Sequence, residues 1–151
     1  MTVSFNGKWV EDKETSTPYQ DVLEAQGVSW ALRQVSSNDD FVVLIIKLLT
    51  VQYTITDTGT TLESIDTQGT KELATLDNEW VERKHPIFGP YKDRMARLSD
   101  SVVSIETSSD RGWAVKGEWR VEENGTVLIR EYEFTSPTLN KLVRLVYKKQ
   151  E

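Results

Sequence analysis

The stretch that decides the fold reads GWAVKGEWRV and runs from Gly112 to Val121. Its odd-numbered positions carry apolar or small side chains, whereas its even-numbered positions are mostly charged. Successive side chains of a β-strand point to opposite faces of a sheet, so this alternation predicts a strand with one buried and one solvated face. The buried face carries Trp113 and Trp119, and we therefore expect two tryptophans to line the interior.

Gly117 lies between these tryptophans on the same face. A glycine has no side chain, so we expect it to leave room for a ligand beside the two rings. The alternative is that the aromatic side chains fill a barrel that is packed solid, as small barrels often are.

Strand patterns continue on both sides of this stretch. The runs are rich in β-branched and aromatic residues, and turn signals such as Asp57-Thr58-Gly59 and Glu123-Asn124-Gly125 separate them. Short links of this kind connect antiparallel neighbours. The other expected strands are Phe5–Val10, Phe41–Leu49, Thr50–Thr56, Thr60–Thr67, Lys71–Leu76, Trp80–His85, Arg94–Leu98, Val102–Thr107, Thr126–Phe134 and Lys141–Lys149.

Helical periodicity is confined to the beginning of the chain. Pro18 can open a short helix from Tyr19 to Gln26, Gly27 can end it, and a second short helix is expected from Ser29 to Val35. About ten antiparallel strands suffice to close a barrel, which removes the exposed edges of an open sheet. The sequence therefore predicts an all-β fold, a closed antiparallel barrel with a helix-turn-helix lid, as one domain over residues 1–151.

Composition argues against several kinds of site. The chain has no cysteine and one histidine, His85, which excludes disulfide scaffolds, thiol nucleophiles and metal sites built from several imidazoles. A formal net charge of −6, with scattered lysine and arginine, argues against nucleic-acid binding. Because no run is apolar enough to span a bilayer and the first residues do not resemble a secretion signal, we expect a cytoplasmic protein without metal or cofactor.

The strand expected from Thr126 to Phe134 places an arginine among apolar neighbours. Its even-numbered positions are Leu128, Arg130, Tyr132 and Phe134. A guanidinium inside a barrel needs a carboxylate, a hydroxyl or an anionic ligand group as its partner. Arg130 is therefore either a ligand anchor or one half of an internal ion pair, with Glu82 as the candidate partner.

The segment from Trp80 to His85 brings a carboxylate, a guanidinium and the single imidazole within six positions. Strand parity puts Trp80 and Glu82 on one face and Arg83 and His85 on the other. Histidine suits proton transfer near neutral pH, so the candidate catalytic residues are His85, Glu82 and Arg83. The alternative is a structural role for a histidine at the rim of the barrel, where Pro86 favours an extended backbone.

The front of the chain resembles a known family. FNGKW at residues 5–9, a short helix and QGVSWALRQV at residues 26–35 resemble the first strand and helical lid of the intracellular lipid-binding proteins, the fatty-acid-binding branch of the calycin superfamily. The resemblance implies inward arginines and a tyrosine that hold a ligand carboxylate, and Arg130 and Tyr147 fall where two of these are expected. The family's Arg-x-Tyr ending is not kept, because Arg144 lies three positions before Tyr147 and hence on the opposite face.

The middle and end of the chain are similar to a group of fungal lipocalin-like proteins. The shared features are W-x-E-R-x-H followed by F-G, a later G-W and a final R-L-V-Y, here at Trp80 to His85, Phe88-Gly89, Gly112-Trp113 and Arg144 to Tyr147. Taken together, the two resemblances cover nearly the whole chain. They imply a calycin barrel, a fold that serves carriers, sensors and a few enzymes.

Two functions follow. The first is a cytosolic carrier or sequestering protein that binds a hydrophobic small molecule, an aromatic or lipidic metabolite, in the barrel cavity. The second is a cofactor-free cyclase or isomerase of secondary metabolism, which would fold a polyketide or isoprenoid in the same pocket and guide one proton transfer. The residues expected to bind the ligand are Tyr53, Trp80, Trp113, Trp119, Arg130, Tyr132, Tyr147 and, from the lid, Arg33.

Overall fold

The computed structural model describes residues 5–18, 20–26, 52–66, 69, 71–85 and 88–150. The expected helix from Ser29 to Val35, the expected strand from Phe41 to Leu49 and the lid residue Arg33 lie outside these ranges. The strands are β1 (Gly7–Glu11), β2 (Gln52–Asp57), β3 (Thr61–Ile65), β4 (Lys71–Thr75), β5 (Val81–His85), β6 (Gly89–Ser99), β7 (Val102–Ser109), β8 (Ala114–Glu122), β9 (Val127–Thr135) and β10 (Asn140–Gln150).

The described helical elements are short. Helix α1 (Gln20–Ala25) follows β1, and the 3₁₀ turn η1 (Glu123–Gly125) joins β8 to β9, where Asn124 adopts a positive φ of 57°. Such a backbone is typical of asparagine in a tight turn. Neither of these helical elements in the described ranges has the length and apolar character needed to cross a membrane.

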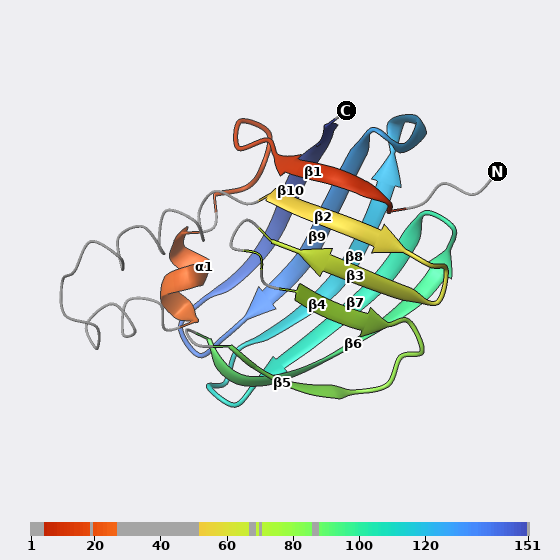
Figure 1. Cartoon of the computed structure of the whole chain (residues 1–151). Coiled ribbons are helices and arrows are strands. Elements are labelled where there is room, and N and C mark those ends of the chain that lie inside the picture. The colour runs from red at the N-terminus through yellow and green to blue at the C-terminus, as the bar shows by residue number, and fades with distance from the viewer. Residues whose placement is uncertain are drawn as a thin grey trace.

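All ten strands form one antiparallel sheet in the order β4-β3-β2-β1-β10-β9-β8-β7-β6-β5. The sheet curls so that the strands β1 to β4 lie across from β6 to β10, with α1 at one end of the enclosed space (Figure 1). The prediction of an all-β antiparallel barrel of about ten strands is confirmed.

The barrel closes differently from the prediction at one place, between β4 and β5. These two strands are the edges of the sheet, and no ladder joins them in the described part of the chain. The side chain of Arg83 on β5 reaches across instead, and its Nη2 donates a hydrogen bond of 2.8 Å to the backbone oxygen of Leu73 on β4. We call this boundary between β4 and β5 the seam.

Strand β6 begins at Gly89, five residues earlier than the predicted strand that starts at Arg94. Gly89 and Pro90 are strand breakers in sequence patterns, and Asp93 is an acidic residue at an inward position. The early part of β6 nevertheless pairs with β5, because Arg83 provides the buried Asp93 carboxylate with a cation at 2.9 Å.

The strand β8 keeps the predicted alternation. Trp113, just before β8, and Trp119 within it are both buried on the inner side. Gly117, however, does not leave room for a ligand: a Cβ atom there would overlap the carbonyl oxygen of Glu131 and lie 2.5 Å from Cα of Tyr132. The glycine is needed because β8 and β9 approach each other too closely for any side chain.

Candidate functional site

A cavity of about 300 Å³ lies inside the barrel, next to α1. Its wall is mostly apolar and aromatic, with a small number of charged and hydroxyl side chains among them. A concave site of this composition is typical of small-molecule binding. The alternative of a solidly packed barrel is therefore not what the structure shows.

Arg130 on β9 is the cation of the inner wall. Its Nη1 donates a hydrogen bond of 3.2 Å to Oη of Tyr147, and its guanidinium carbon lies 3.9 Å from the ring centroid of Trp119 and 4.7 Å from that of Tyr53. Burial by itself would lower the pKa of Arg130, but its interactions with Tyr53 and Tyr147 outweigh burial and raise it. None of the ion pairs among the described residues includes Arg130, although the Glu72 carboxyl is near enough to interact electrostatically with it.

The tyrosines around Arg130 are kept in their neutral form by the same surroundings. Burial raises the pKa of Tyr132 to about 12, and burial also raises the pKa of Tyr147 despite the nearby guanidinium. Neutral phenols can donate and accept hydrogen bonds, so this part of the wall offers uncharged polar groups around one fixed positive charge.

A second polar group of the wall lies at the seam. Nε of Arg83 donates to both carboxylate oxygens of Asp93, at 2.9 and 3.0 Å, and lies 3.2 Å from Oε1 of Glu72. Burial, together with the nearby Asp93, raises the pKa of Glu72, although Arg83 and Arg130 act in the opposite direction. Both carboxylates line the cavity.

Aromatic rings form the part of the wall nearest the turns beside α1. Trp113 stacks on Phe134 with a centroid distance of 6.1 Å and meets Phe88 edge to face at 6.3 Å. Tyr91 adds a tilted ring at 6.5 Å from Trp113. Such pairs hold the rings in fixed orientations and give a rigid apolar surface.

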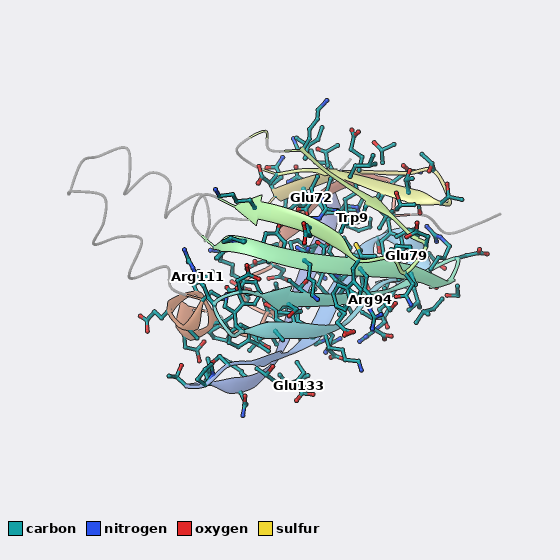
Figure 2. All side chains as sticks on the ribbon, turned by 90° about the horizontal axis from the view of Figure 1, so that it is seen from below. Trp9, Glu72, Glu79, Arg94, Arg111 and Glu133 are labelled. Atoms are coloured by element: carbon teal, nitrogen blue, oxygen red, sulfur yellow. The ribbon has the colours of Figure 1, made fainter. Side chains whose placement is uncertain are left out.

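Helix α1 borders the cavity at the same end, with Val22 and Leu23 in its lining. Two contacts hold it on the barrel. Nζ of Lys141 lies 3.0 Å from the carboxylate of Asp21 and, through this hydrogen bond, lowers the pKa of Asp21. Arg111 lies beside α1 (Figure 2) and its Nη1 donates to the backbone oxygen of Gln26 at 3.4 Å.

Most of the residues that the sequence assigns to ligand binding meet in this cavity. Its lining includes Tyr53, Trp113, Trp119, Arg130, Tyr132 and Tyr147. Trp80 does not line the cavity, so its predicted role in ligand binding is wrong: 40% of its surface is exposed. On the outer side of the barrel, Nζ of Lys92 and Cζ of Arg94 lie 4.9 and 4.4 Å from the centroid of its ring.

The candidate catalytic residues are not brought together. Glu82 is exposed on the outer face and lies outside the cavity, so the predicted ion pair between Glu82 and Arg130 is wrong. Arg83 faces inward, but its guanidinium is held by Asp93, Glu72 and the Leu73 backbone. The side chain of His85 lies outside the described part of the structure.

Glu72, Asp93 and Thr107 line the cavity and are missing from the sequence-based set. In the run KELAT, from Lys71 to Thr75, the structure turns Glu72 inward and leaves the apolar Leu73 56% exposed. The signal that could have revealed Asp93 is its parity with Met95, which is buried on the same strand.

Comparison with known proteins supports the fold alone. No protein-family model matches the chain, and no curated protein matches it. A Schistosoma mansoni fatty acid binding protein in complex with arachidonic acid superposes with a TM-score of 0.67 at 20% identity, covering 100% of both chains. Echinococcus granulosus fatty-acid-binding protein 1 gives 0.63 at 20% identity, covering 97% of this chain and 98% of its own.

The fatty-acid-binding protein isolated from Manduca sexta gives a TM-score of 0.63 at 15% identity, covering 96% of this chain and 99% of its own. At these identities the likeness concerns architecture. The chain has the fold of these fatty-acid-binding proteins.

Proposed function

We propose that the protein binds a hydrophobic small molecule with an acidic head group inside the barrel, as its carrier or sequestering protein. The observation that carries this proposal is Arg130, a cation on the cavity wall whose side chain hydrogen-bonds to Tyr147 and takes part in no direct ion pair among the described residues, the Glu72 carboxyl acting on it only through space. A buried charge without a counter-charge is costly. A ligand carboxylate would supply the counter-charge and form charge-assisted hydrogen bonds with the guanidinium.

The position of Arg130 suggests how such a ligand lies. Arg130 is the register partner of Trp119, and Trp113 lies six residues earlier along the chain toward the α1 end. At about 3.3 Å per residue, roughly 20 Å of backbone separates the two tryptophans. We infer that the acid group sits at Arg130 and that the hydrocarbon part extends toward Trp113 and α1.

The neighbours in fold are consistent with this ligand class, since they are described as fatty-acid-binding proteins and one is bound to arachidonic acid. The cyclase alternative has no support, because Glu82 lies outside the cavity and Arg83 is held by its own ion pairs. The proposal includes the cytosol as the site of action, which fractionation of cells that express the chain would test.

The test compares stearate with stearyl alcohol, which has the same chain and no charge. Affinities are measured by displacement of a fluorescent fatty acid from the wild type, Arg130→Met and Arg144→Met. Arg144 is the matched control because it is exposed and points outward on β10. We expect Arg130→Met to weaken stearate about ten- to a hundredfold, as for hydrogen bonds to charged groups, and to leave the alcohol unchanged.

Tyr147→Phe provides a second variant, because it removes one hydroxyl beside Arg130 and keeps the ring. A smaller loss for stearate alone is expected there. Equal losses for stearate and alcohol in Arg130→Met, or stearate binding no tighter than the alcohol in the wild type, would overturn the acid-binding proposal.

A further inference from the structure

The cavity wall carries a second set of polar side chains at a distance from Arg130. Glu72 on β4, Asp93 on β6 and Thr107 on β7 all line the cavity. Asp93 and Thr107 are register partners on neighbouring strands, and the carboxyls of Glu72 and Asp93 both contact the guanidinium of Arg83 at the seam. Three elements that are separate in the chain therefore place two carboxyls and a hydroxyl on one part of the wall.

These three side chains differ in how many hydrogen-bond partners the protein gives them. Asp93 accepts two hydrogen bonds from Arg83. Glu72 contacts Arg83, yet 44% of its side chain stays accessible, and the residue lines the cavity. Thr107 is only 8% exposed, and its hydroxyl makes no hydrogen bond to any residue that the structure describes.

The Thr107 hydroxyl is not among the fully buried polar atoms without a partner in the described residues, so it is accessible on the cavity wall and is free to form a hydrogen bond with a group inside the cavity. Threonine can both donate and accept, and a carboxyl accepts. The partner that suits both side chains is a group that donates to Glu72 and accepts from Thr107, which is what an alcohol does.

The register gives the position of this partner along the ligand. Thr107 pairs with Val115 on β8, and Arg130 pairs with Trp119 on the same strand. Four residues, or about 13 Å of strand, separate these levels. An extended hydrocarbon chain of about ten carbon–carbon bonds of ~1.5 Å spans a similar length.

We propose that Glu72, Asp93 and Thr107 form a second polar subsite, which binds a hydroxyl in the middle of the hydrocarbon chain of the acid. This deepens the proposed function and rests on it. The ligand class is then a long-chain acid with a mid-chain hydroxyl. A plain alkyl chain at the same place would leave Thr107 without a partner and cover Glu72 with apolar surface, which is unfavourable for both.

Burial raises the pKa of Glu72, which favours its neutral form. A carboxyl in either protonation state accepts a hydrogen bond from a hydroxyl. This is the reason for choosing hydroxylated acids as probes.

The experiment measures dissociation constants of stearate, mid-chain hydroxystearate and α-hydroxystearate, in which the hydroxyl is next to the carboxylate. The wild type is expected to prefer the mid-chain derivative over stearate about three- to tenfold, the effect of one or two net hydrogen bonds, and to show no such preference for the α-derivative. Thr107→Val removes the hydroxyl at nearly constant shape and should abolish the preference. Glu72→Gln should reduce it.

Thr75→Val and Glu82→Gln repeat the two substitutions at exposed positions and should keep the preference. Thr107→Ser retains a hydroxyl and should retain the preference as well, which distinguishes loss of the subsite from a disturbed fold. Thermal melting checks that each variant is folded.

Equal affinities of the wild type for stearate and mid-chain hydroxystearate would overturn the subsite, and the polar groups would then hold water only. The same would follow if Thr107→Val kept the full preference. In both cases Arg130→Met would still separate stearate from stearyl alcohol, so a failure of the subsite is distinguishable from a failure of the acid-binding proposal.

Discussion

Replacement of Arg83 by methionine tests whether this side chain holds the seam. The substitution keeps an unbranched apolar stem and removes the guanidinium that contacts Glu72, Asp93 and the Leu73 backbone oxygen. The side chains of Arg83 and Asp93 are 16% and 9% exposed, so their attraction is only partly screened by water. Removing one member of a buried ion pair costs about 3–5 kcal/mol.

Two features of the seam reduce that figure. The side chain of Glu72 is 44% exposed, so water screens its attraction to Arg83. The two carboxyls also interact electrostatically, so they can share a proton once the cation is gone. We therefore expect Arg83→Met to lower the free energy of unfolding by about 2–4 kcal/mol at neutral pH.

The loss is expected to depend on pH in a defined direction. Burial raises the pKa of Glu72 in the folded state, and Arg83 opposes this rise. Without Arg83 the folded-state pKa goes higher still. A carboxyl with a raised folded pKa favours the folded state below its unfolded pKa and loses this contribution as the pH rises through the folded value. The wild type and the variant share the unfolded pKa of Glu72, so the contribution of this group to their difference changes only where their folded states differ in protonation. The difference is therefore smallest below the folded-state pKa of the wild type, which lies above 4.5, and it grows as the pH rises through that value.

The assay is urea unfolding followed by tryptophan fluorescence at several pH values. Arg94→Met is the control, because Arg94 pairs with Glu106 on the outer side and both are about a third exposed, so less than about 1 kcal/mol is expected. Adding Glu72→Gln and Asp93→Asn to Arg83→Met should recover most of the loss. A loss below about 0.5 kcal/mol at neutral pH, or one independent of pH, would refute the assignment of Arg83 to the seam.

Three further outcomes are expected. Gly117→Ala should lower the free energy of unfolding by about 1–3 kcal/mol or more in a thermal or urea melt, because the added Cβ overlaps the β9 backbone. Asp57→Asn should lower the free energy of unfolding by about 1–3 kcal/mol at neutral pH. The reason is that two backbone N–H groups and Arg97 outweigh burial and lower the pKa of Asp57 in the folded protein. This stabilisation is present above pH 3.8 and is lost as the pH falls through the folded-state pKa, so the stabilities of the two proteins converge in acid. Lys141→Met should cost less than about 1 kcal/mol but speed amide hydrogen exchange in α1, because Asp21 loses its cation.

The inner face of the barrel could be read from the sequence because it depends on local parity. The alternation in GWAVKGEWRV places Trp113 and Trp119 inside, and the even-numbered set of β9 places Arg130 beside them. Both inferences need only that a strand has two faces. Tyr147 is expected on this wall from the resemblance to the lipid-binding proteins, and it lines the cavity together with Tyr53.

The polar groups at the seam could not be read in this way. Glu72 points inward and Leu73 outward, against the apolar pattern, because Arg83 from β5 and Asp93 from β6 stabilise the buried carboxyl. That compensation joins residues on different strands, which a single run of sequence does not reveal. The prediction that Trp80 lines the cavity is wrong for the opposite reason. A large aromatic side chain suggests the interior, but two cationic side chains, Lys92 and Arg94, cover its ring on the outside of the barrel.

The pairing of β1 with β10 has a consequence for how the chain connects and folds. Lys8 and Gln150 are register partners, so the backbones of the first and last strands lie about 5 Å apart. Every other ladder joins strands that are consecutive among those described. The β1–β10 pair alone closes a loop of nearly the full chain length, and closing so long a loop costs conformational entropy. A circular permutant that links the two ends and opens the chain between β4 and β5, at residues 77–79, would keep all nine ladders and make the β1–β10 ladder local in the chain. Its contact order falls, and its folding rate is expected to rise accordingly.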